Sequence, residues 1–170
     1  MNTQPLHLVA IAAMARNRVI GNGLTIPWKH SADMKYFKEV TTGHTVLMGS
    51  RTYESLDRPL GLPNRVNIVV SGTLDPLPGE VILISSLSKL GEVTYDRDKI
   101  FVIGGARMYE QLLPSCQELL LTMVDEIPEG DVVMPPFEHL FEQPEVIRQE
   151  GPLTFLRYKR LQGPGRPVQS

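Results

Sequence analysis

The stretch FVIGGARMYEQLL, residues 101–113, runs from a strand into a helix through two adjacent glycines. Its first residues are bulky and apolar, as in a strand buried on both faces, and a helical pattern begins near Ala106. The stretch TVLMGSRTYESL, residues 45–56, repeats the arrangement with Gly49 at the joint. A strand followed at once by a helix is the unit from which helix-covered parallel sheets are built. These two stretches therefore predict the core of the fold.

The same alternation of strands and helices extends outward along the chain. Apolar runs rich in β-branched residues predict strands at Leu8–Met14, Thr45–Gly49, Val66–Ser71, Val81–Ile84, Ile100–Gly104 and Leu119–Val124. Helical patterns predict helices at Ser31–Thr41, Arg51–Leu56, Leu87–Val93 and Arg107–Leu113. The chain then passes through a loop with two prolines to a last strand at Leu153–Leu161, without a long helix before it. We therefore predict an α/β fold: a single-domain, doubly wound, mostly parallel sheet with an antiparallel C-terminal strand and helices on both faces.

Length and composition exclude several classes of protein. The chain has 170 residues and a formal net charge of -2, which fits one domain, residues 1–161, and a disordered tail, residues 162–170, rich in Gly and Pro. No basic excess or basic stripe is present, so we expect no nucleic-acid partner. The single Cys116 excludes an internal disulfide and a multi-cysteine zinc site, and the four histidines show no ligand spacing. We expect no metal.

The apolar run LVAIAAMA, residues 8–15, ends in a pattern similar to a signal-peptidase site. No Lys or Arg precedes it and it is short for the apolar core of a signal peptide, so a buried first strand is the favoured interpretation. No stretch is long enough to cross a membrane. We expect a cytoplasmic protein without a membrane partner, and a monomer is the default.

Both glycine joints are suited to binding phosphate. In an open parallel sheet the two following helices start at the same carboxyl edge, where ligands bind. Free N–H groups at a helix start favour anions, and Arg51 and Arg107 in the first turns add cationic donors. The alternative is that the glycines only form turns and the arginines are solvated. The occurrence of two such joints in one small sheet favours a dinucleotide.

The helix predicted in GLTIPWKHSADMKYFKEV, residues 23–40, turns a carboxylate inward. Asp33 shares the apolar stripe with Phe37 and Val40, while Met34 and Tyr36 flank that stripe. An inward carboxylate normally has a partner or a task. The alternative explanation for Asp33 is electrostatic. Ser31 is a suitable N-cap residue, and an Asp in the first turn of the helix complements the helix dipole.

Two further residues have a structural and a functional interpretation. Trp28, the only tryptophan, is either a core anchor or part of a site. The hydroxyl of Thr122, inside the apolar run LLLTMVD, either satisfies its own backbone or lies beside a buried carboxylate. A carboxylate, a hydroxyl and aromatic rings at a dinucleotide-binding edge would suit a planar ligand with two parallel N–H donors.

The chain resembles a dihydrofolate reductase of the bacterial, monofunctional type, from about Leu8 to about Leu161. The motifs that carry this resemblance are VAIAAMARNRVIG, IPWKHSADMKYFK, VLMGSRTYESL, RPL followed by NRVNIVVS, VIGGARMYEQLLP, LLLTMVD and EGDVVMP, in the family's order and spacing. The resemblance implies NADPH-dependent reduction of dihydrofolate to tetrahydrofolate, for one-carbon metabolism. It also implies that antifolate inhibitors bind.

The resemblance implies roles for individual residues. Asp33 would bind N3 and the 2-amino group of the pterin, with Thr122 in the same network and Trp28 as a third catalytic residue. The implied substrate-binding residues are Ile11, Ala12, Ala13, Asp33, Phe37, Lys38, Leu56, Arg58, Arg65, Ile103 and Thr122. The implied cofactor-binding residues are Ala13, Val19, Ile20, Gly21, Asn22, Gly23, Leu24, Thr25, Gly49, Ser50, Arg51, Thr52, Ser71, Gly72, Ile103, Gly104, Gly105, Ala106, Arg107, Met108, Tyr109 and Gln111.

Three more features follow from the resemblance. Gly104 and Gly105 would be joined by a cis peptide. The segment from Asn22 to Ile26 resembles the mobile loop that closes over nicotinamide, and Asp131 resembles the residue that holds it closed. Arg65 resembles the arginine that pairs with the α-carboxylate of the substrate's glutamate.

The chain departs from the family near the 2′-phosphate of the cofactor. Ser50 stands where a basic residue is usual, and Gly72 stands where a hydroxyl residue often occurs. A preference for NADPH over NADH then depends on Arg51 and Arg107. Two rival functions are a reductase of a pyrimidine precursor of riboflavin, which is a distant relative, and a non-catalytic nucleotide-binding module.

Overall fold

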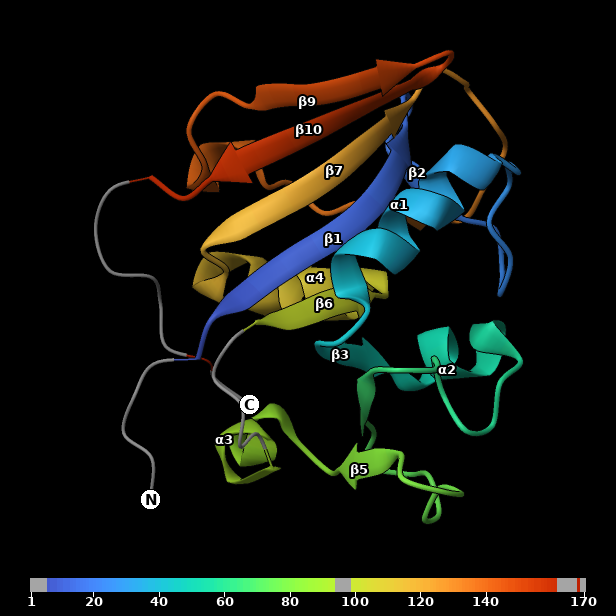
Figure 1. The fold of residues 1–170 in the computed structure, drawn as a ribbon, viewed down its shortest axis with the longest axis vertical. Coiled ribbons are helices and arrows are strands. Elements are labelled where there is room, and N and C mark those ends of the chain that lie inside the picture. The colour runs from blue at the N-terminus through green and yellow to red at the C-terminus, as the bar shows by residue number, and fades with distance from the viewer. Residues whose placement is uncertain (1–5, 94–98, 162–167, 169–170) are drawn as a thin grey trace.

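The computed structural model describes residues 6–93, 99–161 and 168 (Figure 1). The strands are β1 Leu8–Ala15, β2 Val19–Gly21, β3 Thr45–Gly49, β4 Val66–Val70, β5 Ile82–Ile84, β6 Ile100–Gly104, β7 Glu118–Val124, β8 Val132–Val133, β9 Glu145–Glu150 and β10 Leu153–Lys159. The helices are α1 Ser31–Thr41, α2 Ser50–Leu56, α3 Leu90–Val93 and α4 Ala106–Leu112, with 3₁₀ turns at Leu87–Lys89, Leu113–Ser115 and Glu138–Leu140. The predicted tail, residues 162–170, lies outside the described residues apart from Val168.

Across these described ranges, eight strands form one sheet in the order β5-β4-β3-β6-β1-β7-β10-β9. The pairs from β5 to β7 are all parallel, whereas β10 is antiparallel to both β7 and β9. The strand β1 lies between β6 and β7, so both of its edges are hydrogen-bonded. The predicted fold class is confirmed, including the antiparallel strand near the C-terminus.

Alternate residues of β1 point to opposite faces of the sheet, and each face has its own core. Leu8 and Ala10 belong to a cluster with the side chains of α4, whereas Val9 and Ile11 belong to a cluster with Tyr36 of α1. Figure 1 shows α1 on one side of the sheet and α4 on the other. The expectation of a buried first strand with helices on both faces is therefore confirmed.

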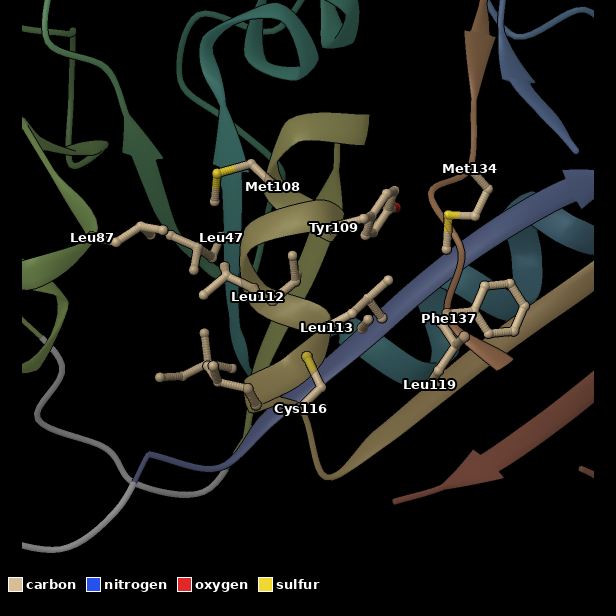
Figure 2. Packing of buried hydrophobic residues seen from close by; sticks show 14 of the residues in the cluster. Leu47, Leu87, Met108, Tyr109, Leu112, Leu113, Cys116, Leu119, Met134 and Phe137 are labelled. Atoms are coloured by element: carbon tan, nitrogen blue, oxygen red, sulfur yellow. The ribbon is translucent and has the colours of Figure 1, made fainter. Parts of the chain in front are cut away.

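The helix α4 covers one face of the parallel strands (Figure 2). Met108 and Leu112 point from α4 toward Leu47 of β3, and all three belong to the same buried cluster. Cys116, which follows α4, is completely buried in this cluster, and burial raises the pKa of its thiol to about 12. Cys116 is therefore a packing residue rather than a reactive thiol.

Three strands were missed by the sequence prediction. β2 and β8 contain three and two residues and pair only with each other, so neither has a detectable pattern. β9 reads EVIRQE, and all six residues are exposed at the edge of the sheet. Alternation of apolar and polar residues arises from one buried face, and β9 has none.

Two details of the helices differ from the prediction. The helix expected at Leu87–Val93 divides into a 3₁₀ turn and the short α3. The N-cap of α1 is His30 and not Ser31, and His30 makes no side-chain capping bond. The other boundaries agree within one or two residues. Among the helices of the described ranges, none has the length and hydropathy needed to span a membrane.

We expect Leu112→Ala to lower the free energy of unfolding by about 2–5 kcal/mol, because it removes a fully buried side chain between α4 and the sheet. Urea denaturation followed by circular dichroism measures the change. The matched control is Ile127→Ala, since Ile127 is 70% exposed, and its effect should stay within about 0.5 kcal/mol. Equal effects of both substitutions would contradict the assigned core.

Candidate functional site

A cleft of about 1170 Å³ opens at the carboxyl edge of the parallel strands. Its walls come from the ends of β1, β3 and β6, from the starts of α2 and α4, and from one face of α1. The chain crosses from one side of β1 to the other in this region, which is where open parallel sheets bind ligands. The sheet topology therefore explains why segments far apart in sequence share one cleft.

The carboxylate of Asp33 lies in the first turn of α1 and lines this cleft, together with Phe37 one turn later. Its side chain is half-buried. Burial raises the pKa of Asp33, while hydrogen bonding by the Thr122 side chain and positive charge on His30 act in the opposite direction. Asp33 therefore points inward, as the helical pattern of the sequence predicted. Tyr36, expected only to flank the stripe, is buried, whereas Met34 is 60% exposed.

Thr122 lies on β7, directly beside Ala13 of β1 in the sheet register. It is almost fully buried and lines the cleft across from α1. Of the two interpretations of this hydroxyl, the structure supports the one that places it beside a carboxylate, because the Thr122 side chain lowers the pKa of Asp33 and both residues line the same cleft.

Trp28 combines both of the roles considered for it. Its ring is 7% exposed and packs in the same core cluster as Ile11 and Tyr36. It also lines the cleft, and its indole Nε1–H is buried without an acceptor among the described residues. A buried donor normally has a partner, so this N–H is available to a water molecule or a ligand.

The joint between β6 and α4 brings the backbone to the surface of the cleft. The peptide between Gly104 and Gly105 is cis, as the resemblance implied. Gly104 has a φ of 129°, and a Cβ there would stand 3.1 Å from Oγ1 of Thr52. Only glycine fits this position without strain, and it leaves the backbone open to a ligand. Nearby, the hydroxyl of Tyr109 donates to the carbonyl oxygen of Ile11 at 2.7 Å and so fixes α4 to β1.

The cationic and hydroxyl groups of the cleft lie along the starts of α2 and α4. Arg51 and Arg107 are exposed and line the cleft. The hydroxyls that line it beside them belong to Ser50, Thr52, Ser55, Ser71, Thr73, Ser85 and Ser86. Within the described lining residues these two arginines are the only cationic side chains, so they are the charged donors that the lining offers to an anionic group of a ligand.

The loop between β2 and α1 covers one end of the cleft. The N–H of Gly23 donates to Oδ1 of Asp131 at 2.8 Å, which is the contact implied for the closing loop. Pairing of β2 with β8 joins the same two segments. Gly130 packs so closely that a Cβ there would stand 2.6 Å from the carbonyl oxygen of Gly21. These contacts hold the loop against residues 130–133.

The structure brings most of the predicted residues to this cleft, but five do not line it: Val19, Asn22, Lys38, Arg58 and Arg65. Arg65 lies instead near the end of α1, where its Nη1 donates to Oγ1 of Thr41 at 3.0 Å and its Nε to the carbonyl oxygen of Pro63 at 2.9 Å. Burial, and then the charge of Arg58, lower the pKa of Arg65. The roles of these five residues stay predictions.

Several lining residues were not predicted individually: Ile26, Met34, Tyr36, Ser55, Val70, Thr73, Ser85, Ser86, Leu87, Glu110 and Val132. Some could have been found, because Thr73 and Ser85 follow the parallel strands β4 and β5 at the same edge as the glycine joints. Val132 could not, because its strand has only two residues. Within the part of the chain that the structure describes, no group of three or more His, Cys, Asp or Glu side chains could hold a metal ion.

The fold and the cleft define an α/β protein with a ligand site at the carboxyl edge of a parallel sheet. The dihydrofolate reductase family model matches residues 7–160. Similar proteins include dihydrofolate reductase of Bacillus subtilis, 40% identical over 75% of each chain, and dihydrofolate reductase HdrB of Haloferax volcanii, 38% identical over 92% of this chain and 85% of that one.

A solved structure of dihydrofolate reductase from Enterococcus faecalis, complexed with NADP(H) and RAB-propyl, has a similar fold. It is 29% identical, has a TM-score of 0.79, and the match covers 92% of this chain and 97% of that one. The chain belongs to the dihydrofolate reductase family. The resemblance seen in the sequence is confirmed, and the protein is an oxidoreductase.

We expect Asp33→Asn to stabilise the protein at neutral pH and to have little effect near pH 3. Burial raises the pKa of Asp33 in the folded protein, so the stability associated with its protonated form is lost as pH rises from the unfolded to the folded pKa. Asparagine keeps the shape without that charge. Thermal melting of both proteins from pH 3 to pH 8 measures the difference. If Asp33 only complemented the helix dipole, the variant would instead lose about 0.3–1 kcal/mol at neutral pH.

Proposed function

We propose that the protein reduces 7,8-dihydrofolate to 5,6,7,8-tetrahydrofolate with NADPH, so that C6 receives a hydride and N5 receives a proton. The product would supply one-carbon metabolism. The observation that carries this proposal is the half-buried Asp33, placed beside Thr122 in a cleft whose other end is formed by two glycine joints. One end suits a planar base and the other a dinucleotide.

The pterin would bind at the end of the cleft formed by α1 and β1. The two oxygens of Asp33 can accept the parallel N–H groups at N3 and the 2-amino position, and Thr122 completes this network. Phe37 and the backbone of residues 11–13 line the same region and can cover the ring. A diaminopyrimidine antifolate can present a similar edge when protonated, so we expect such inhibitors to bind here.

The residues of the glycine joints fit NADPH. Because Gly104 has no side chain, its backbone is accessible to a ligand, and a side chain at this position would occupy that space. Arg51 and Arg107 provide the charge for phosphates, and hydroxyls from α2 and from the segments that follow β4 and β5 line the same cleft. The loop that Asp131 holds through Gly23 can cover the nicotinamide end and exclude water. The solved relative from Enterococcus faecalis, complexed with NADP(H), supports this cofactor.

The role of Asp33 in the proton transfer would be electrostatic. In the family's geometry this carboxylate is too far from N5 to deliver a proton directly, so water is the expected carrier. A negative charge held beside the pterin favours its protonated form. The buried indole N–H of Trp28, which has no acceptor among the described residues, can hold such a water molecule. Cytoplasmic location and a monomeric state stay predictions.

The first test is the oxidation of NADPH with and without dihydrofolate, followed by absorbance. We expect oxidation only when dihydrofolate is present. Oxidation driven by a pyrimidine ribosyl precursor of riboflavin would favour the first rival, and binding of NADPH without turnover of either compound would favour a non-catalytic module.

The second test is the pH profile of hydride transfer for the Asp33→Asn variant. At neutral pH the rate of hydride transfer should fall by orders of magnitude. Lowering the pH should partly restore the rate, because substrate protonated in solution brings its own proton. A variant that remains active and insensitive to pH would contradict the role of Asp33.

For the cofactor we predict that NADPH is preferred over NADH through Arg51 and Arg107. One charge-assisted contact contributes about 1.5–3 kcal/mol, so Arg51→Gln or Arg107→Gln should each weaken NADPH binding roughly tenfold to hundredfold. Both residues are exposed, so the lower end of this range is expected. Calorimetric titration measures both dissociation constants, with Arg16→Gln, which lies outside the cleft lining, as the matched control. Equal binding of NADH and NADPH by the unmodified protein would show that Ser50 and Gly72 have removed the preference.

A further inference from the structure

An ion pair beside the cleft joins two segments that are distant in the sequence. Nε2–H of His30 donates to Oε2 of Glu126, 96 residues further along the chain. The side chains of His30 and Glu126 are 24% and 40% exposed. The neighbouring pair of Arg16 and Asp125 is 62% and 67% exposed. The His30 pair is therefore the less exposed of the two, and lower exposure reduces screening by water and salt.

His30 immediately precedes α1, and its backbone shapes the first turn of that helix. Its carbonyl oxygen accepts hydrogen bonds from the N–H of Asp33 at 3.1 Å and of Met34 at 3.4 Å. Its side chain makes no capping bond to the helix and instead contacts Glu126. A displacement of His30 would therefore move the turn that carries Asp33.

Glu126 belongs to segment 125–131, between β7 and β8, which the fold holds in place. The backbone bonds that fix Glu126 run from Arg16 N–H to its carbonyl oxygen at 3.1 Å and from its own N–H to the carbonyl oxygen of Val124 at 2.8 Å. At the other end of the segment Asp131 accepts from the N–H of Gly23. Segment 125–131 therefore contacts loop 22–30 at both of its ends.

We propose that His30 and Glu126 are positioning residues, whose ion pair holds the start of α1 against segment 125–131 and so sets the place of Asp33 in the cleft. The inference rests on the function proposed above, because it gives the pair a role in binding dihydrofolate. Neither residue lines the cleft, so both act through α1 and loop 22–30.

The charges around the pair make this positioning dependent on pH. Titratable and charged groups lie on every element beside His30. They are Lys29 of the same loop, Asp33, Lys35, Tyr36, Lys38 and Glu39 of α1, Asp125, Glu126, Glu129 and Asp131 of segment 125–131, Arg16, and Arg148, which packs over Tyr36. Positive charge on His30 lowers the pKa of Asp33. Loss of that charge weakens the pair and removes an attraction that favours the ionised carboxylate.

The variants that test the proposal are His30→Gln, Glu126→Gln and the double variant, with Asp125→Asn as the matched control because it breaks the exposed neighbouring pair. We expect each single variant to raise the KM for dihydrofolate about twofold to fivefold with kcat nearly unchanged. The double variant should be no worse than the poorer single variant, since both remove one interaction. His30→Gln should also move the apparent pKa of the kcat/KM profile upward, because it removes a positive charge that lowers the pKa of Asp33. Asp125→Asn should change neither quantity.

A second measurement needs neither substrate nor turnover. Trp28 is the only tryptophan and lies two residues before His30, so its fluorescence reports on this end of the loop. Acidification of the ligand-free protein should change the emission, and this change should be lost in His30→Gln and Glu126→Gln and retained in Asp125→Asn. Turnover with the same KM, pH profile and emission in all variants would overturn the proposal and leave the function intact. Loss of the emission change without any turnover in the unmodified protein would support the pair while contradicting the function.

Discussion

The pairing of β1 with a parallel strand on each edge is the constraint on which the rest of the structure depends. It places β6 and β7 on either side of one apolar strand and covers both faces of that strand with core. The carboxyl ends of the parallel strands then meet at one edge, where the glycine joints of residues 49 and 104 lie beside Thr122. The cleft is a consequence of this pairing, because strand direction decides where each joint emerges.

Within that frame, the chemistry depends on a carboxylate that the fold keeps only partly hydrated. Burial disfavours the ionised form of Asp33, while Thr122 and the charge of His30 favour it. These opposing effects come from three elements, α1, β7 and the residue before α1, so the carboxylate responds to the tertiary structure as a whole. A stability cost at Asp33 is consistent with a functional site, since such costs are retained only where a task requires them.

Much of the architecture and of the cleft could be predicted from the sequence because the decisive signals are local. The apolar run at residues 8–15 and the two glycine joints predicted the parallel core, and the helical position of Asp33 predicted its inward orientation. The missed elements lack such signals. β9 is exposed at every residue, and β2 and β8 are too short to show a period. Ser31 has the usual chemistry of an N-cap, yet the N-cap of α1 is His30, whose side chain contacts Glu126 and makes no capping bond to the helix.

The sequence by itself determined the fold class, the family and the residue types of the cleft, because hydrophobic period, glycine spacing and motif order are properties of the chain in one dimension. Only the tertiary structure decided which polar groups meet. Thr122 lowers the pKa of Asp33 from the neighbouring wall of the cleft, Tyr109 donates to the carbonyl oxygen of Ile11, and Glu126 pairs with His30 across 96 residues. Hydrogen bonds and ion pairs act over a few ångströms, and their partners become neighbours only after the strands have found their order in the sheet.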